Sequence, residues 1–337
     1  MQRFLFLLFI LLVTASTGLA GETLQSVKAR GVVRCGVGDI IPGMAEKDST
    51  GLWRGMDVDF CRALAAAVLQ KAEKVSFLPL PSRARFSALL SKEIDILSRN
   101  TSLTLGREAQ IGVSFVGPLL LTGQSFLVAA SDAPKGLACL DKASICLVRG
   151  STHVQNLEDL AAAKGFSYQP QMHDSIELAT EAFLKGACTA FTGDALVLAA
   201  AQKHTPGGAE RFALLPNIYS KEPISPVVRQ DDNQWLLVLK CVLSALLTAE
   251  ECGLTQEAMR SGQGAAGNAA AQSFLQRTDS LSKSLGLEPG WAGRVVAATG
   301  NYGEMFERNL GANSAYKLDR GYNKLVRNGG LMFALPF

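Results

Sequence analysis

The chain has 337 residues, 48% of them hydrophobic, with 33 Lys and Arg against 30 Asp and Glu. This length suffices for two domains or lobes, each with a core of its own. The near balance of charge lacks the basic surface of a nucleic-acid-binding or membrane-surface protein, so we expect neither partner.

Residues 1–20 have the composition of a secretory signal peptide. Arg3 is their only charge, residues 4–13 are apolar, and Gly18-Leu19-Ala20 offers small residues for cleavage after Ala20. No cysteine stands there for a lipid anchor, and no later run reaches the roughly 18 apolar residues of a membrane span. We therefore expect a soluble, exported mature chain with 32 basic and 30 acidic residues, a net charge of +2.

Residues 32–97 alternate strand and helix patterns. Apolar runs at 32–37, 75–80 and 94–97 are typical of buried strands, whereas apolar residues recur at helical spacing over 58–68 and 86–90. The order β-α-β-α-β predicts a parallel sheet with helices on both faces.

The same pattern restarts after residue 140. Strands are predicted at 144–148, 166–172 and 188–191, with helices over 154–161 and 176–184. A further extended piece at 224–228 precedes helices at 235–247 and 291–298, and the glycine- and alanine-rich residues 261–271 are predicted to form a loop. Two α/β units in one chain indicate two lobes with a cleft between them.

The segment after the strand at Ile94 has the features of an anion site. Polar residues 98–102 end the strand, Thr104 can cap a short helix, and Arg107 lies in its first turn. Helix N-termini favour negative charge, and a guanidinium matches a carboxylate. The alternative is a surface arginine beside an ordinary loop.

Two further polar residues follow strands in the same way. Thr152 follows the strand at 144–148 in a turn that ends in a helix cap, and Asp194 lies beyond the strand at 188–191. Ligands of open parallel sheets bind beyond the carboxyl ends of the strands, so these positions and Arg107 predict one site.

Three stretches of the sequence resemble a known family. Gly55-Met-Asp57-Val-Asp59-Phe-Cys-Arg-Ala-Leu-Ala is similar to the signature of periplasmic amino-acid-binding proteins of ABC transporters, the bacterial extracellular solute-binding proteins of family 3. The long segments 220–232 and 300–311 resemble its general L-amino-acid-binding subgroup. The likeness extends over nearly the whole mature chain.

The resemblance implies a two-lobed α/β fold of the type II periplasmic-binding-protein class, each lobe a mostly parallel sheet flanked by helices. It assigns residues 22–118 plus 222–337 to lobe 1 and residues 119–221 to lobe 2. Ligand binding would bridge the lobes and favour the closed state.

The resemblance also implies roles for single residues. Arg107 would bind the α-carboxylate of an L-amino acid with both arms of its guanidinium, helped by Ser102 and Thr152, and Asp194 would bind the α-ammonium. Asn100, in the polar segment before Arg107, and Ser151, next to Thr152, complete the expected ligand-binding set.

Other readings of these residues stay open. Asp194, Ser102 and Thr152 could be helix caps, and Asp57 and Asp59 are expected to organise a turn and a helix start. His153 is interpreted as a solvated loop residue. Trp53 could shield the cleft or pack on lobe 1.

Seven cysteines in an exported chain predict disulfides with at least one thiol left over. We expect Cys146 to pair with Cys188, because both lie on strands that the topology places side by side, and Cys35 to pair with Cys61. No metal-ligand spacing joins the cysteines to the three histidines, so we expect no metal site and no cofactor.

The leading hypothesis is a monomeric, non-enzymatic periplasmic protein that delivers amino acids to an inner-membrane ABC permease. An exported cyclohexadienyl (arogenate or prephenate) dehydratase on the same fold is a second hypothesis, since fold does not fix function, and a soluble amino-acid sensor is a third. The dehydratase would need a general acid in the cleft, where Asp194 is the only carboxylate among the matched positions.

We expect a broad ligand range. In basic-amino-acid binders of the family two aromatic rings clamp the ligand side chain, and Ile41 and Ser82 stand at those positions here. Without stacking or cation–π attraction the site should recognise the zwitterionic head more than the side chain.

Overall fold

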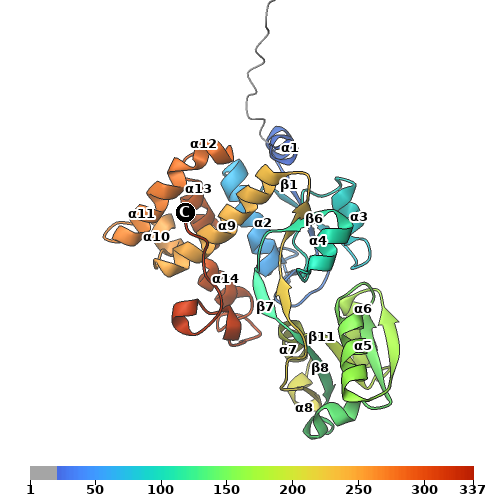
Figure 1. The fold of residues 1–337 in the computed structure, drawn as a ribbon. Coiled ribbons are helices and arrows are strands. Elements are labelled where there is room, and N and C mark those ends of the chain that lie inside the picture. The colour runs from blue at the N-terminus through green and yellow to red at the C-terminus, as the bar shows by residue number, and fades with distance from the viewer. Residues whose placement is uncertain (1–20) are drawn as a thin grey trace, which may run out of the picture.

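The computed structural model describes residues 21–337, so the signal peptide expected at residues 1–20 lies outside the described residues. The chain forms two lobes, each built on a five-stranded sheet, and a pair of crossing strands joins them (Figure 1). Over residues 21–337, no helix combines the length and apolarity needed to cross a bilayer.

The first sheet has the strand order β4-β1-β5-β14-β6. Four strands run in one direction and β14 runs in the opposite one, because β1 pairs parallel with β4 and β5 while β14 pairs antiparallel with both β5 and β6. The sheet is therefore mostly parallel, as expected. Its strands are β1 (Val33–Val37), β4 (Val75–Pro79), β5 (Ile96–Leu97), β6 (Val113–Phe115) and β14 (Val227–Arg229).

Side chains alternate between the two faces of this sheet. Ile96 packs into the core with helices α2 (Met56–Leu69), α9 (Asn233–Glu251) and α13 (Trp291–Thr299), and the next residue, Leu97, packs on the other face with α3 (Arg85–Leu90). Both faces of the strand are thus covered, which explains its uninterrupted apolar sequence.

The second sheet repeats this arrangement with the order β10-β9-β11-β8-β12. Ile145 on β9 packs towards α5 (His153–Lys164), and its neighbour Cys146 packs towards α6 (Ile176–Leu184) and α7 (Ala195–His204). The strands are β8 (Gln124–Ala129), β9 (Ala143–Val148), β10 (Tyr168–His173), β11 (Ala190–Asp194) and β12 (Phe212–Leu214), of which β8 alone is reversed.

The reversed strands lie where the chain changes lobe. Strand β7 (Leu120–Thr122) leads into β8, and β13 (Glu222–Ile224) leads into β14; β7 and β13 pair antiparallel. The remaining elements are α1 (Glu22–Arg30), β2 (Glu46–Lys47), β3 (Trp53–Arg54), α4 (Leu105–Ile111), η1 (Ala133–Leu140), α8 (Gly208–Arg211), α10 (Gln256–Arg260), α11 (Ala269–Ser280), α12 (Ser282–Leu285), α14 (Tyr302–Asn309), η2 (Gly321–Asn323) and η3 (Val326–Asn328).

The turn before α2 fixes the polar segment of residues 98–102. Gly55 has φ +128°, and a Cβ there would lie 2.1 Å from the Met44 carbonyl oxygen, so only glycine fits. Two residues later the buried Asp57 carboxylate accepts bonds from Ser98 Oγ (2.8 Å) and the Asn100 N–H (2.9 Å). Burial raises the pKa of Asp57 to about 6, which these bonds oppose.

Trp53 packs on the first lobe. Its ring centroid lies 5.9 Å from that of Phe77, and the Lys47 ammonium lies 5.1 Å from its centroid. Trp53 is therefore not one of the residues that line the pocket between the lobes.

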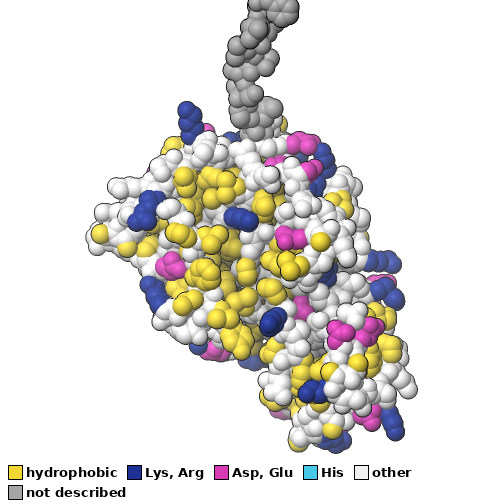
Figure 2. All heavy atoms as spheres, in the orientation of Figure 1, with side chains coloured by type: hydrophobic (Ala, Val, Ile, Leu, Met, Phe, Trp, Pro, Cys, Tyr) yellow, Lys and Arg dark blue, Asp and Glu magenta, His cyan; other side chains and the backbone are white. Residues whose placement is uncertain are grey.

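The last residues of the chain fold back over the first lobe and hold a crossing strand. Asn323 accepts the Leu121 N–H (2.6 Å) and donates to the Leu121 carbonyl (2.9 Å), and Tyr302 donates to the Leu119 carbonyl (3.0 Å). Figure 2 shows hydrophobic side chains gathered on this lobe, and the exposed Leu331 and Phe333 line a shallow cavity beside α9.

Both expected disulfides are present. Cys35 on β1 bonds to Cys61 on α2 with a Cα separation of 6.4 Å, and Cys146 on β9 bonds to Cys188 just before β11 with 5.6 Å. These separations lie within the range that a disulfide spans. Three thiols stay free in residues 21–337: Cys139, Cys241 and Cys252.

Thiol counting checks this covalent pattern. The mature protein, denatured without reductant, should react with a thiol reagent at three cysteines, because the other four are held in two disulfides. After reduction, all seven cysteines should react. Seven reactive thiols before reduction would contradict the pairing.

Candidate functional site

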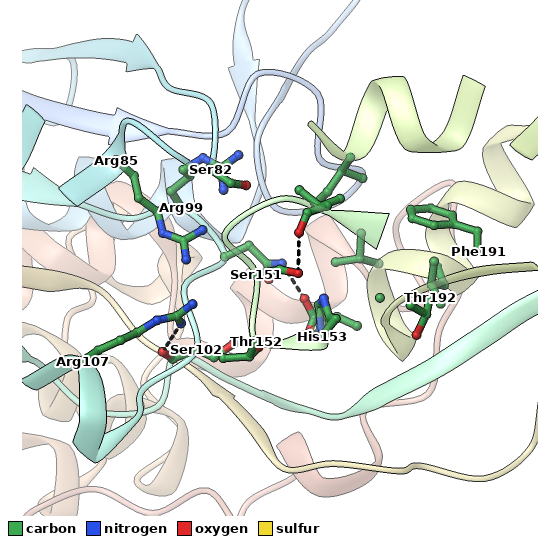
Figure 3. A pocket seen from close by; sticks show the side chains of 17 residues that line it. Ser82, Arg85, Arg99, Ser102, Arg107, Ser151, Thr152, His153, Phe191 and Thr192 are labelled. Atoms are coloured by element: carbon green, nitrogen blue, oxygen red, sulfur yellow. Dashed lines mark hydrogen bonds and ion pairs between the residues drawn. The ribbon is translucent and has the colours of Figure 1, made fainter. Parts of the chain in front are cut away.

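A pocket lies between the lobes, at the carboxyl ends of β5, β9 and β11. Figure 3 shows Arg85, Arg99 and Arg107 on one side, with His153, Phe191 and Thr192 across from them. All six residues predicted from the sequence line it: Asn100, Ser102, Arg107, Ser151, Thr152 and Asp194. The other lining residues are Ser82, Arg85, Arg99, Val148, His153, Ile176, Phe191, Thr192, Gly193, Val197 and Leu198.

Polar contacts cross the pocket from one lobe to the other. Asn100 Nδ2 donates to Asp194 Oδ2 (2.6 Å), and the hydroxyls of Ser102 and Thr152 lie 3.3 Å apart. The cavity left between them is about 30 Å³, room for about two water molecules. Molecules much larger than water therefore do not fit between the lobes in this arrangement.

Helix α4 places Arg107 at the pocket. Thr104 caps this helix, as predicted, by accepting the Arg107 N–H (3.2 Å), and the guanidinium donates to the Ser102 carbonyl (2.7 Å). Its carbon lies 5.6 Å from the centre of the Phe86 ring. Burial lowers the pKa of Arg107, and the nearby carboxylates of Glu222 and Asp194 oppose that shift.

Two further arginines, which were not predicted from the sequence, face the pocket. Arg85, the first residue of α3, and Arg99, two residues after β5, are each only 3% exposed. Arg85 donates to the Gly150 carbonyl across the cleft (3.2 Å), and Arg99 donates through Nε to the Leu80 carbonyl (2.6 Å).

Asp194 is not the helix cap that its position allowed. It stands at the N-cap of α7, but its carboxylate accepts no bond from that helix. Instead it turns towards Asn100, and Oδ1 lies 3.5 Å from His153 Nε2. Asp194 is 3% exposed, so its charge acts in a poorly solvated site.

The interpretation of His153 as a solvated loop residue is wrong. His153 is the first residue of α5 and is 8% exposed. Burial alone would lower its pKa, but the adjacent Asp194 carboxylate outweighs this and raises the pKa above the ordinary value. Local sequence carried no signal for this contact, since its partner is 41 positions away.

Thr152 is the N-cap residue of α5, but its hydroxyl makes no capping bond. It donates to Glu222 (2.9 Å), which also accepts bonds from Asn156 (2.7 Å) and Ser220 (3.1 Å). The Ser151 hydroxyl donates to the Val148 carbonyl (2.7 Å) and closes the turn. The expected side-chain cap at Thr152 is therefore absent, because a buried carboxylate on β13 competes for the hydroxyl.

Within residues 21–337, two groups of side chains approach metal-ligand geometry. Cys146 and Cys188 belong to a disulfide, which removes the group that includes His173. In the other group, His153 and Asp194 lie near Glu222, whose oxygens already accept three hydrogen bonds.

The two positions of the expected side-chain clamp lie in different places. Ser82 lines the pocket, whereas Ile41 lines an adjacent cavity of about 180 Å³ that shares Arg99 and Ile176 with it. Neither position presents an aromatic ring.

The fold and this cleft define a two-lobed solute receptor of the type II periplasmic-binding-protein class. Residues 33–279 match the sequence profile of the bacterial extracellular solute-binding proteins, family 3. The chain belongs to this family, which confirms the resemblance seen in its sequence.

Relatives match over almost their whole length. The glutamate/glutamine/aspartate/asparagine-binding protein BztA of Rhodobacter capsulatus is 38% identical over 319 residues, covering 94% of each chain. The general L-amino acid-binding periplasmic protein AapJ of Rhizobium johnstonii is 37% identical over 327 residues, covering 96% of this chain and 95% of AapJ.

A solved structure shows the same fold. It is an ABC transporter periplasmic binding protein from Brucella ovis with glutathione bound. It superposes with a TM-score of 0.88 at 36% identity, covering 93% of this chain and 98% of that one.

The His153–Asp194 contact predicts a pH dependence of stability. A raised pKa means that protonated His153 stabilises the fold below its unfolded pKa of about 6.5, and this contribution disappears as pH rises through the folded pKa. Urea unfolding of wild type and His153→Gln at several pH values should show that only wild type loses this stability towards alkaline pH.

His204→Gln is the matched control, because His204 is exposed at the end of α7. It should keep the wild-type profile. Identical profiles for wild type and His153→Gln would contradict the assignment.

Proposed function

We propose that this protein is the periplasmic substrate-binding component of an ABC transporter, which binds L-amino acids in the cleft and delivers them to an inner-membrane permease. The observation that carries the proposal is the opposed charge at the cleft: Arg107 on one lobe and Asp194 on the other line the same pocket. An α-amino acid presents the complementary pair of charges.

The proposal assigns residues 22–118 plus 222–337 to one lobe and 119–221 to the other. The protein acts as a monomer in the periplasm after its signal peptide is removed, and it needs no nucleic acid or cofactor. The names of BztA and AapJ support amino acids as the ligand class.

At one end of the pocket, the ligand carboxylate binds Arg107. Its guanidinium keeps donors beyond the one held by the Ser102 carbonyl, and a carboxylate can accept two in parallel. The Ser102 hydroxyl adds a donor from one lobe and the Thr152 backbone N–H adds one from the other, because the Thr152 hydroxyl already donates its proton to Glu222. Ser151 shapes the turn that carries Thr152.

At the other end, the ligand ammonium binds Asp194. It takes the place of the Asn100 amide and His153, which are the groups now nearest to this carboxylate. Asn100 then remains beside the ligand as a hydrogen-bonding group. Since the two ligand charges bind residues of different lobes, the ligand stabilises the closed arrangement.

A dehydratase on this fold has less support. Among the described residues that line the pocket, Asp194 is the only carboxylate, and the proposal assigns it to the ligand ammonium. A carboxylic acid close to a leaving group is then missing from that lining, and His153, which also lines the pocket, lies beside Asp194. Incubation with arogenate or prephenate tests this directly, and turnover would overturn the non-enzymatic assignment.

Arg107→Ala should nearly abolish amino-acid binding. Loss of a charge-assisted, enclosed pair costs at least ~3 kcal/mol, a factor beyond ~100 in affinity. Calorimetric titration of wild type and variant with a panel of the twenty amino acids measures this. A variant that unfolds at the wild-type temperature and binds within about threefold of wild type would contradict the role of Arg107.

Asp194→Asn should weaken α-amino acids much more than the matching acids that lack the amino group. The lost charge faces the ammonium, so des-amino acids lose little. Titration of wild type and variant with glutamate and glutarate compares the two classes. Equal weakening of both would mean that Asp194 supports the fold and does not bind the ammonium.

A further inference from the structure

The charges that line the pocket do not balance. Arg85, Arg99 and Arg107 are cationic, and Asp194 is the single carboxylate among the described lining residues. A zwitterionic amino acid engages Arg107 through its carboxylate and Asp194 through its ammonium, and it adds no net charge. Two buried guanidinium groups then stay without an anion in the pocket, which is costly in a poorly solvated site.

Arg85 points into the pocket with unused hydrogen-bonding capacity. Its Nη2 donates to the Gly150 carbonyl at 3.2 Å, and Arg107 Nη2 approaches the same oxygen at 3.5 Å, so the two cations are neighbours. Arg85 Nε is buried and has no partner. Burial lowers the pKa of Arg85, and repulsion from Arg107 and Arg99 lowers it further.

Arg99 is held in place but not neutralised within the pocket. Its Nε donates to the Leu80 carbonyl, which leaves the terminal nitrogens for other partners. The carboxylate that acts on it is Asp57, which lies behind the polar segment and is already bonded to Ser98 and Asn100. Arg99 also borders the adjacent cavity of about 180 Å³, so this side of the pocket can extend.

We propose that Arg85 and Arg99 form a second anion subsite. This subsite binds a carboxylate on the ligand side chain and gives acidic amino acids the highest affinity. This inference rests on the proposed function. It refines the expectation of a broad ligand range. Neutral amino acids still bind through their zwitterionic carboxylate and ammonium groups. The cationic side chains of lysine and arginine would be repelled by Arg85 and Arg99.

The test compares L-glutamate with L-glutamine, which have nearly the same shape and differ in the charge of the side chain. At neutral pH wild type should bind glutamate about tenfold more tightly, because hydrogen bonds to charged groups are roughly twice as strong as neutral ones. Raised salt should reduce this ratio.

Arg85→Gln should bring the glutamate-to-glutamine ratio close to one while glutamine affinity stays within about threefold of wild type. Arg85→Lys, which keeps a charge, should retain part of the preference. Arg83→Gln is the matched control: its side chain is 66% exposed, lies outside the pocket lining, and reaches Asp174 only at 4.0 Å. It should leave the ratio unchanged.

The outcomes separate the two proposals. If folded wild type binds glutamine as tightly as glutamate, the subsite is refuted and amino-acid binding stands. If Arg85→Gln folds and keeps the wild-type ratio, Arg85 does not read the side chain and the subsite is again refuted. If no amino acid binds to folded wild type, the proposed function falls as well. Should Arg85→Gln fail to fold, the wild-type ratio and its salt dependence still decide.

Discussion

The structure depends on holding opposite charges at one cleft, a half-buried Arg107 and a buried Asp194 on facing lobes. Arg107 and Asp194 belong to different sheets, and each is fixed by its own lobe: Arg107 by the capped helix α4, Asp194 by the end of β11. In the closed arrangement Asn100 bridges to Asp194, so a polar bond forms in a region that water can hardly reach. Such a contact is strong when complete and costly when one partner is left unpaired.

The sheet topology explains why these charges meet. In each sheet one strand is reversed, β14 in the first and β8 in the second, and each of them continues a crossing strand. The carboxyl ends of the parallel strands therefore face one another across the paired strands β7 and β13. Asn323 binds both backbone groups of Leu121, which attaches the start of the crossing strand to the first lobe and fixes the base from which the second lobe projects (Figure 1).

Local sequence patterns predicted most strands of the two sheets, though not β8 or β12, and they predicted the Thr104 cap and the segments that line the site, because each depends on neighbours along the chain. They could not distinguish Arg85 from Arg83: both are arginines in one turn, and only the start of α3 buries one and exposes the other. The same limit applies to Thr152, whose hydroxyl bonds to Glu222, 70 positions away. Contacts between the lobes override the local preference for a cap.

The placement of three arginines around one pocket, Arg85 and Arg99 buried and Arg107 half-buried, also has a thermodynamic consequence. Taking a guanidinium from water costs free energy that the apolar cores beneath the sheets must offset. In return the cations are already desolvated and held by carbonyls at Ser102, Gly150 and Leu80 before a ligand arrives. An incoming carboxylate then meets oriented donors that need little rearrangement, so more of its interaction appears as affinity. If the proposed anion subsite is correct, the cleft exchanges part of the stability of the fold for selectivity towards anionic groups.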